Sequence, residues 1–235
     1  MSSASKPPRR PVLCYVTDRR SLLPHAARPV AACAESSLLN KIERAAAAGV
    51  DWIQLREKDL SGRALTSLTR AALQRIRGQT SPARLFVNDR VDVALSSGAG
   101  GVHLGEAGIP VEEARRLNDD FFSRLSDSTG FLIGVSCHSV EAMRRAAASG
   151  ADYIYFGPVF ATPSKAGFGP PQGLERLSEA CRTTQLPVVA IGGITQSNAA
   201  ECLLAGAAGI AAIRLFQDTD ELSYIVGKLH ALPCG

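Results

Sequence analysis

Short segments rich in Val, Ile, Leu and Ala alternate with longer amphipathic segments through about eight units of this chain. The short segments predict strands, and their continuous apolar character is typical of a parallel sheet that is covered on both faces. The expected strands are 12–17, 51–56, 84–87, 101–104, 131–135, 153–156, 188–191 and 209–213. The expected helices are 37–49, 61–77, 91–97, 110–120, 140–150, 174–184, 195–205 and 220–232, with Thr195 as a helix cap. Eight such units in 235 residues predict a single α/β domain, a closed (β/α)8 TIM barrel with parallel strands.

Composition narrows the class of protein. The net charge of +4 is not organised into basic runs, so nucleic acid is not indicated as a partner. No segment is long and apolar enough to span a membrane. The composition of residues 1–11 predicts a disordered tail that is not a signal peptide. Residues 12–235 are expected to form the barrel. The six cysteines have no metal-site spacing, which favours a reduced, cytoplasmic protein; a homo-oligomer is left open.

Polar residues collect where the expected strands end. The second strand finishes in Gln54-Leu55-Arg56-Glu57-Lys58, which indicates that its end opens onto a polar site, although an ordinary solvated loop is the alternative. In a barrel, the carboxyl ends of all strands form one ring, and ligands bind there. The other members of this expected ring are Asn88, Asp89, His103, Ser136, His138, Thr162, Ser164, Lys165, Gly192, Gly193 and Arg214. Cations and small hydrogen-bonding groups dominate the ring, which predicts a phosphorylated substrate.

Several members of the ring also have ordinary structural interpretations. Gly192-Gly193 either presents backbone N–H groups to a phosphate or forms a tight turn. Asp89 is either a ligand of Mg²⁺, which usually takes one or two carboxylates, or the cap of the next helix. His103 and His138 contact ligand or are satisfied core histidines. Lys165 lies in the long segment 157–173, where loops of this length are usually functional, or is simply solvated.

Six motifs, taken in order, resemble the thiamine phosphate synthase family, which includes the related thiazole tautomerases. The matching segments are Gln54-Leu55-Arg56-Glu57-Lys58, Val87-Asn88-Asp89, Gly101-Val102-His103-Leu104-Gly105, Gly134-Val135-Ser136-Cys137-His138-Ser139, Gly157-Pro158-Val159-Phe160 with Thr162-Pro163-Ser164-Lys165, and Ile191-Gly192-Gly193-Ile194. The resemblance implies a transferase that joins hydroxymethylpyrimidine diphosphate to a thiazole phosphate, with Mg²⁺ as cofactor. The products would be thiamine phosphate and pyrophosphate.

The resemblance also implies roles for individual residues. The implied diphosphate ligands are Gln54, Arg56, Lys58, Asn88 and Lys165. Asp89 would bind Mg²⁺, and Ser136 would contact the pyrimidine. The implied thiazole phosphate ligands are Thr162, Ser164 and Gly193. His103 is a further candidate for substrate binding, and the candidate catalytic residues are Arg56, Lys58, Lys165, Ser136 and His138.

The chain departs from the family pattern at two positions. Gly108 stands where the family usually has the Asp that is the second magnesium ligand, and Glu106 is a candidate to replace it. Arg214 stands where a small Ser helps to hold the thiazole phosphate. An Arg at this position would pair with that phosphate or block its site, so we count Arg214 among the candidate substrate-binding residues.

Three other functions remain open on the sequence. A thiazole tautomerase is favoured by the missing magnesium ligand, with His138 as its acid–base residue. Retention of Gln-x-Arg-Glu-Lys and Asn-Asp favours the synthase instead. A non-catalytic barrel that binds a phosphorylated ligand would keep the ring without turnover. A different phosphate-handling isomerase would need a carboxylate base, for which Glu57 and Glu106 are the candidates.

Overall fold

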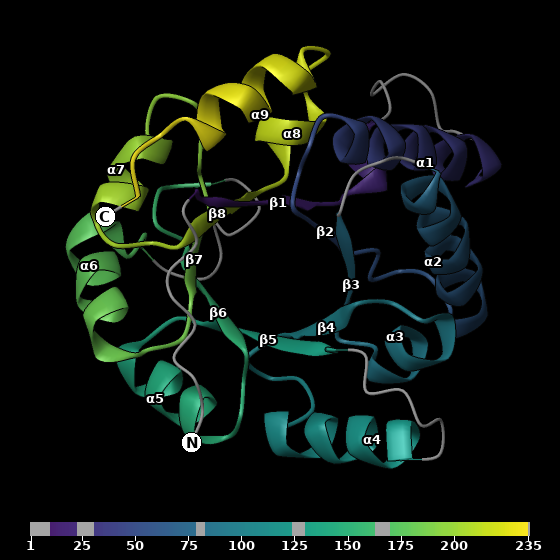
Figure 1. Ribbon diagram of the computed structural model, residues 1–235, viewed down its shortest axis with the longest axis horizontal. Helices are drawn as coiled ribbons and strands as arrows, with labels where there is room; N and C mark the ends of the chain where they lie inside the picture. The colour runs from purple at the N-terminus through teal and green to yellow at the C-terminus, as the bar shows by residue number, and fades with distance from the viewer. Residues whose placement is uncertain (1–9, 23–30, 79–82, 124–129, 163–169, 235) are drawn as a thin grey trace.

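The computed structural model of the chain describes residues 10–22, 31–78, 83–123, 130–162 and 170–234, with the backbone alone at 31–33. Eight strands form a closed barrel in the order β1 to β8, and every neighbouring pair is parallel, including β8 with β1. The strands are β1 Val12–Val16, β2 Trp52–Leu55, β3 Arg84–Asn88, β4 Gly101–Leu104, β5 Leu132–Cys137, β6 Tyr153–Phe156, β7 Val188–Ile191 and β8 Gly209–Ala212. The predicted (β/α)8 barrel is therefore confirmed (Figure 1).

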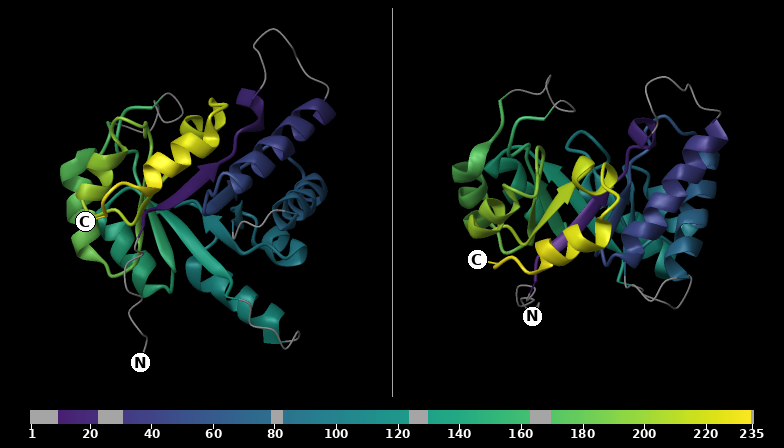
Figure 2. Two further views of the ribbon diagram at one scale, coloured as in Figure 1. Left: turned by 45° about the horizontal axis from the view of Figure 1, so that its top comes forward. Right: turned by 90° about the horizontal axis from the view of Figure 1, so that it is seen from above.

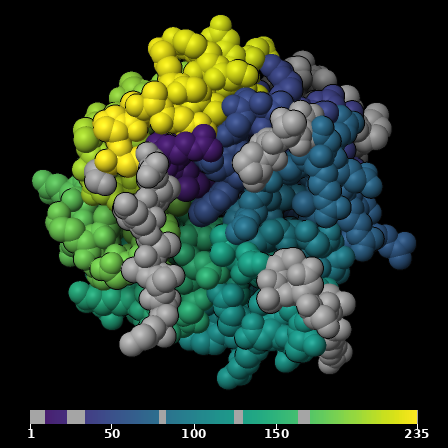
Figure 3. All heavy atoms as spheres, in the orientation of Figure 1, coloured from purple at the N-terminus to yellow at the C-terminus, as the bar shows by residue number. Residues whose placement is uncertain are grey.

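Helices surround the barrel and connect successive strands. They are the 3-10 helix η1 Arg19–Leu22 and the α-helices α1 Ala31–Ala47, α2 Gly62–Arg77, α3 Val91–Ser97, α4 Val111–Ser123, α5 Val140–Ala148, α6 Gly173–Thr183, α7 Ala199–Leu204, α8 Arg214–Gln217 and α9 Leu222–His230. In Figure 2, α9 and α1 lie alongside β1. The yellow C-terminal part of the chain packs beside the purple and blue N-terminal part in Figure 3, as the pairing of β8 with β1 requires. Within the described residues, no helix has the length and apolar character to cross a bilayer.

The core has two layers. Aliphatic side chains fill the space between the strands and the helices, as expected when a parallel sheet is covered on its outer face. The barrel interior is instead lined by large aromatic side chains, among them Phe86, Tyr153 and Tyr155, which pack with Cys14 and Val16. This filled interior is a packed core and not a channel, so ligands are left to the ends of the strands.

Carboxylates secure the amino-terminal end of the barrel. Asp51 precedes β2, and its Oδ2 accepts the N–H of Leu13 in β1 at 2.9 Å. Asp152 precedes β6 in the same way, and its Oδ2 accepts the N–H of Ile133 in β5 at 2.6 Å. His230, the last residue of α9, also bonds to Asp51. These acidic residues are engaged in holding the fold at the end opposite to the predicted site.

Three elements differ from the sequence-based expectation. Helix α1 begins at Ala31 and not at residue 37, because residues 31–36 are mostly helix-favouring. Thr195 does not cap α7, which begins at Ala199; the Asn198 side chain instead accepts the N–H of Thr195 and donates to the carbonyl of Gly193, closing a turn. The short helix α8, only one turn long, was not expected at all.

Candidate active site

A chain of hydrogen bonds joins the carboxyl ends of β2, β3 and β4. The Nε2 of Gln54 donates to Oδ1 of Asn88 at 2.8 Å, and Nδ2 of Asn88 donates to Oδ2 of Asp89 at 2.6 Å. The Oδ1 of Asp89 then accepts the N–H of Gly105 at 2.6 Å. The fold thus brings together three predicted site residues, Gln54, Asn88 and Asp89, from different strand ends. Because Asn88 accepts through Oδ1 and donates through Nδ2, the orientation of its amide is fixed.

Asp89 adopts an unusual backbone conformation. Its φ is 60°, the only positive φ of a non-glycine residue within the described ranges. Such conformations cost about 1–3 kcal/mol and cluster at functional sites. The cap interpretation of Asp89 is wrong, because Arg90 precedes α3, no side chain caps that helix, and the Asp89 carboxylate bonds across to Gly105. The strained residue aims its carboxylate at the β4–α4 turn.

The turn at residues 105–108 lies close to this carboxylate. The N–H of Gly108 donates to the carbonyl of Gly105, which closes the turn. A Cβ placed on Gly108 would lie 3.1 Å from the carbonyl oxygen of Gly105 and 3.3 Å from Oδ1 of Asp89, so the backbone of the turn lies close beside this carboxylate. The carboxylate of Asp89 is the donor type that suits a Mg²⁺ ion, which can take one protein carboxylate and complete its shell with water and substrate phosphates.

Glu106 lies on the same turn, but its carboxylate is directed toward β5. Its side chain is 43% exposed, and Oε2 is 3.9 Å from Nε2 of His138. His138 in turn bonds through Nδ1 to the carbonyl of Gly157, which can only accept, so Nδ1 carries the proton. In the part of the chain that the structure describes, no three His, Cys, Asp or Glu side chains form a metal-binding group. Of the two candidate carboxylates, Asp89 bonds to Asn88 and Gly105, whereas Glu106 lies near His138.

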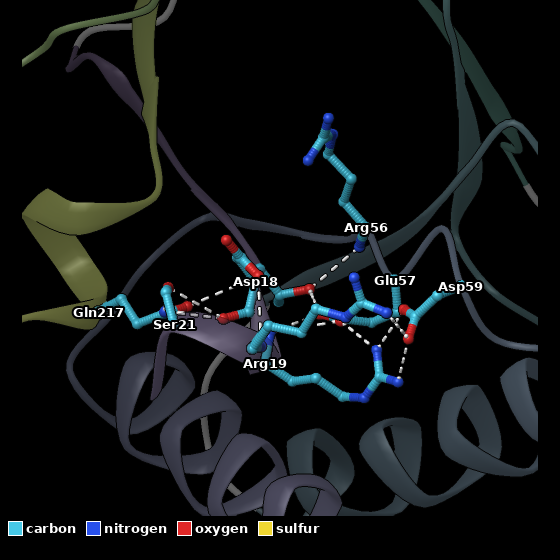
Figure 4. Close-up of polar contacts among 9 residues, drawn as sticks. Asp18, Arg19, Ser21, Arg56, Glu57, Asp59 and Gln217 are labelled. Atoms are coloured by element: carbon cyan, nitrogen blue, oxygen red, sulfur yellow. Dashed lines mark hydrogen bonds and ion pairs between the residues drawn. The ribbon is translucent and has the colours of Figure 1, made fainter. Parts of the chain in front are cut away.

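The Arg56 side chain is oriented differently from that of the neighbouring Glu57. In Figure 4 the Arg56 side chain extends away from Glu57, and neither Arg56 nor Lys58 forms an ion pair with another described residue. Glu57 is buried and accepts hydrogen bonds from Thr17 and Arg19. Burial raises the pKa of Glu57, and the bonds from Thr17 and Arg19 lower it in part. Glu57 is therefore held inside the protein and does not face the ring as a base.

His103 lies beneath the mouth and supports Ser136 from below. The His103 side chain is 1% exposed, so a substrate in the mouth would meet Ser136 first. Its Nε2 is 2.9 Å from the Ser136 hydroxyl, and its Nδ1 is 3.2 Å from the Tyr153 hydroxyl. His103 is within the described residues the one hydrogen-bond partner of Tyr153, so the buried phenol must donate to Nδ1 or leave its proton unsatisfied. We therefore assign the proton of His103 to Nε2, which leaves the Ser136 hydroxyl free to donate toward the mouth.

Burial of His103 predicts a pH-dependent loss of stability. Burial lowers the pKa of His103 from 6.5 to about 3. Below pH 6.5, His103 is protonated in the unfolded state but stays neutral in the folded state. The contribution of His103 to the free energy of unfolding is therefore fully present above pH 6.5 and is lost as the pH falls from 6.5 to 3. We expect the free energy of unfolding to fall by about 2 kcal/mol between pH 6.5 and pH 5 from this residue alone. Urea unfolding of the wild-type protein and of His103→Gln at several pH values measures this decrease. The free energy of unfolding of the variant should lack this part of the pH dependence. An equal pH dependence in both proteins would contradict the lowered pKa of His103.

The β7–α7 turn carries the glycine pair of the predicted phosphate site. Gly192 and Gly193 have φ values of 95° and 68°, and a Cβ on either would collide with the β6–α6 segment, 2.5 Å from Pro158 or 2.7 Å from Phe160. The pair thus permits close packing of two loops. The predicted helix N-terminus beside it is wrong, because α7 begins only at Ala199. Phosphate contacts here would have to come from the turn itself.

The remaining predicted residues are placed in part. Thr162 is half-buried at the end of the described part of the β6–α6 segment, whereas Ser164 and Lys165 lie outside the described residues. Arg214 is exposed as the first residue of α8 and is not buried in the barrel. Sequence reasoning missed Thr17 and Arg19, which contact Glu57. Their position at the end of the first expected strand, and two residues beyond it, was the available signal.

Comparison with known proteins gives consistent matches. A family model described as thiamine monophosphate synthase matches residues 28–216. A thiamine-phosphate synthase of Methanoculleus marisnigri is 51% identical over 170 residues, covering 72% of this chain and 75% of that one. A thiamine-phosphate synthase of Roseiflexus castenholzii is 41% identical over 207 residues, covering 88% and 81%. The solved thiamine phosphate pyrophosphorylase from Pyrococcus furiosus is similar with a TM-score of 0.74 at 32% identity, covering 95% and 96%.

Proposed function

The chain belongs to the thiamine monophosphate synthase family, and on that premise we propose how its residues carry out the reaction. It is a thiamine-phosphate synthase, a transferase that acts on small molecules. We propose hydroxymethylpyrimidine diphosphate and thiazole phosphate as the substrates, and thiamine phosphate and pyrophosphate as the products. The observation that carries the proposal is the hydrogen-bonded chain from Gln54 through Asn88 to Asp89, together with Arg56, whose side chain extends away from Glu57.

The diphosphate would bind over the ends of β2 and β3. Arg56 supplies a planar fork that matches two phosphate oxygens, and Lys58 supplies a compact charge. Gln54 and Asn88 are oriented by their mutual bond, so the amide of Gln54 retains a donor for the substrate. By family resemblance Lys165, which lies outside the described residues, would add a further cation. Such cations stabilise the charge that develops on the departing pyrophosphate.

Asp89 would hold the magnesium ion. When bound, Mg²⁺ would supply positive charge to the phosphate oxygens and help orient them. Asp89 suits this role because both of its oxygens are positioned by hydrogen bonds from Asn88 and Gly105.

The pyrimidine and the thiazole phosphate would occupy the other side of the ring. Ser136, with its hydroxyl proton directed to the mouth by His103, would donate to an acceptor on the pyrimidine. Thr162, Ser164 and Gly193 would hold the thiazole phosphate, and exposed Arg214 would pair with it. The thiazole nitrogen attacks the carbon that the pyrophosphate leaves, so no protein nucleophile is required.

The alternative functions gain no support. The relatives and the solved structure described above are named as synthases or as a pyrophosphorylase, and none is named as a tautomerase or a binding protein. Glu57, one of the two candidate bases for another isomerase, is buried and bound to Thr17 and Arg19. His138 lies near Glu106, but this pair alone does not favour a tautomerase.

A magnesium titration of pyrophosphate release tests the metal site. We expect Glu106→Gln to leave the Mg²⁺ concentration for half-maximal rate within about twofold, because Glu106 faces His138. Gly108→Asp should lower that concentration by about tenfold, because it adds a carboxylate beside Asp89. A tenfold increase in Glu106→Gln would instead place Glu106 on the metal. No release of pyrophosphate from the wild-type protein with both substrates would refute the proposed substrates.

A further inference from the structure

Arg19 has no part in the roles described so far, yet it binds two carboxylates next to the diphosphate cations. Its Nη1 donates to Oε2 of Glu57 at 2.9 Å and to Oδ1 of Asp59 at 2.6 Å. Its Nη2 donates to Oδ2 of Asp59 at 2.7 Å. The Arg19 side chain is only 11% exposed, so the pair with Glu57 is largely shielded from water. One guanidinium from the β1 loop therefore engages both carboxylates of the β2 loop (Figure 4).

The same contacts fix the backbone at Arg56. Thr17, the residue after β1, donates its hydroxyl to Oε1 of Glu57 at 2.7 Å and accepts the N–H of Arg56 at 3.0 Å. The Glu57 side chain is 2% exposed. The backbone N–H of Arg19 also donates to Glu57. The stretch that carries the diphosphate cations is thus anchored to the β1 loop through Thr17 and Arg19.

The charges after β2 alternate in sign. Arg56 and Lys58 are the cations proposed for the diphosphate, while Glu57 and Asp59 are carboxylates within reach of the same loop. Two carboxylates left unpaired beside two cations would compete with phosphate for them. Hydrogen bonds from Arg19 hold the pKa of Asp59 well below its ordinary value, so Asp59 stays ionised and its charge must be offset. Arg19 offsets it, and the Arg56 side chain points the other way.

We propose that Arg19 is a positioning residue of the diphosphate subsite, which engages Glu57 and Asp59 and so keeps Arg56 and Lys58 available to phosphate oxygens. Arg19 acts through these carboxylates and does not touch substrate. The inference rests on the proposed function, in which Arg56 and Lys58 bind the diphosphate.

Arg20 provides a matched control. It is the next residue, carries the same charge and donates to the same Oδ2 of Asp59 at 2.9 Å. Its side chain, however, is 73% exposed, and it has no bond to Glu57. A nonspecific loss of positive charge near the mouth would affect Arg19 and Arg20 variants alike, whereas the proposed role belongs to Arg19.

The test is calorimetric binding of inorganic pyrophosphate in the presence of Mg²⁺. We expect Arg19→Met to weaken binding about tenfold, a typical size for one charge interaction near a surface, and Arg20→Met to change it less than twofold. Adding Asp59→Asn to Arg19→Met should recover most of the affinity, because the competing carboxylate is removed. A purely structural clamp predicts no recovery, since the double variant lacks both sides of the contact.

Other outcomes decide between the inference and the function beneath it. Unchanged binding in Arg19→Met, or no recovery in the double variant, would overturn the role of Arg19 while leaving the subsite in place. Unchanged binding in Arg56→Met would overturn the proposed diphosphate subsite itself, and with it this inference. If Arg19→Met does not fold, the single variant Asp59→Asn tests the proposal. Pyrophosphate affinity equal to or above that of the wild type supports competition between Asp59 and phosphate for the cations. Weaker pyrophosphate binding refutes that competition.

Discussion

Replacing Arg56 with Met is expected to lower kcat/KM for hydroxymethylpyrimidine diphosphate by about 100- to 1,000-fold, the usual cost of removing one donor that stabilises developing charge. Arg56 follows β2 directly, its side chain extends away from Glu57, and no described carboxylate neutralises it. Its charge is therefore available to the departing pyrophosphate. Initial rates of pyrophosphate release, measured with varied diphosphate and saturating thiazole phosphate, give the value.

Arg63 is the control for Arg56. It is an exposed arginine on α2, and Arg63→Met should stay within about twofold of wild type, as is usual for surface substitutions. If Arg56→Met keeps near-normal kcat/KM, or loses activity only together with its folded structure, Arg56 does not bind the diphosphate.

Replacing Asp89 with Asn is the second change with a large expected effect. Asn keeps the size of the side chain and an oxygen for the N–H of Gly105, but it removes the charge that a divalent ion needs. We expect the Mg²⁺ concentration for half-maximal rate to rise by about 100-fold or more, at the upper end of losses seen for groups around a metal. Rates across a magnesium titration, with the fold checked by circular dichroism, measure the change.

Asp92 is the matched control for Asp89. It lies three residues later on α3, and its carboxylate pairs with Arg90 at the surface, 2.6 Å from Nη2. Asp92→Asn should leave the magnesium requirement unchanged. An equal shift in both variants would mean that the net charge of this region, and not coordination at Asp89, sets the requirement.

The barrel and one sector of its ring could be predicted because they depend on local pattern and on topology. The apolar segments predicted the strand boundaries closely, and the bounds of β4 and β6 match the expectation. Once the strands close in order, Gln54, Asn88 and Asp89 must converge, although 34 positions separate Gln54 from Asn88. The convergence of these residues follows from where the strands end and does not depend on side-chain rotamers.

Features that depend on side-chain direction could not be predicted in the same way. His103 ends a strand, but its side chain points into the barrel interior among Tyr153 and Tyr155. Glu106 occupies a turn, where the sequence does not reveal whether a side chain faces Asp89 or His138. The Arg19 contacts span 38 to 40 positions, and they depend on how the β1 loop folds back over β2.

Helix boundaries were missed where two residues could serve as caps. Thr195 precedes an apolar run and has a cap-forming side chain, yet Asn198 closes the turn and the helix begins after it. The single-turn α8 is too short to show helical periodicity. Because α8 begins at Arg214, the residue that departs from the family pattern lies on a helix and is exposed, and not within a buried strand.

The central claim is that the ends of β2 and β3 bind a diphosphate through Arg56 and through a divalent ion on Asp89. A crystal structure of the protein with Mg²⁺ and inorganic pyrophosphate tests it most directly. The account predicts pyrophosphate bonded to Arg56, with the metal bridging its oxygens to Asp89 and Glu106 remaining near His138. Pyrophosphate bound away from Arg56, or a metal that does not contact Asp89, would contradict it.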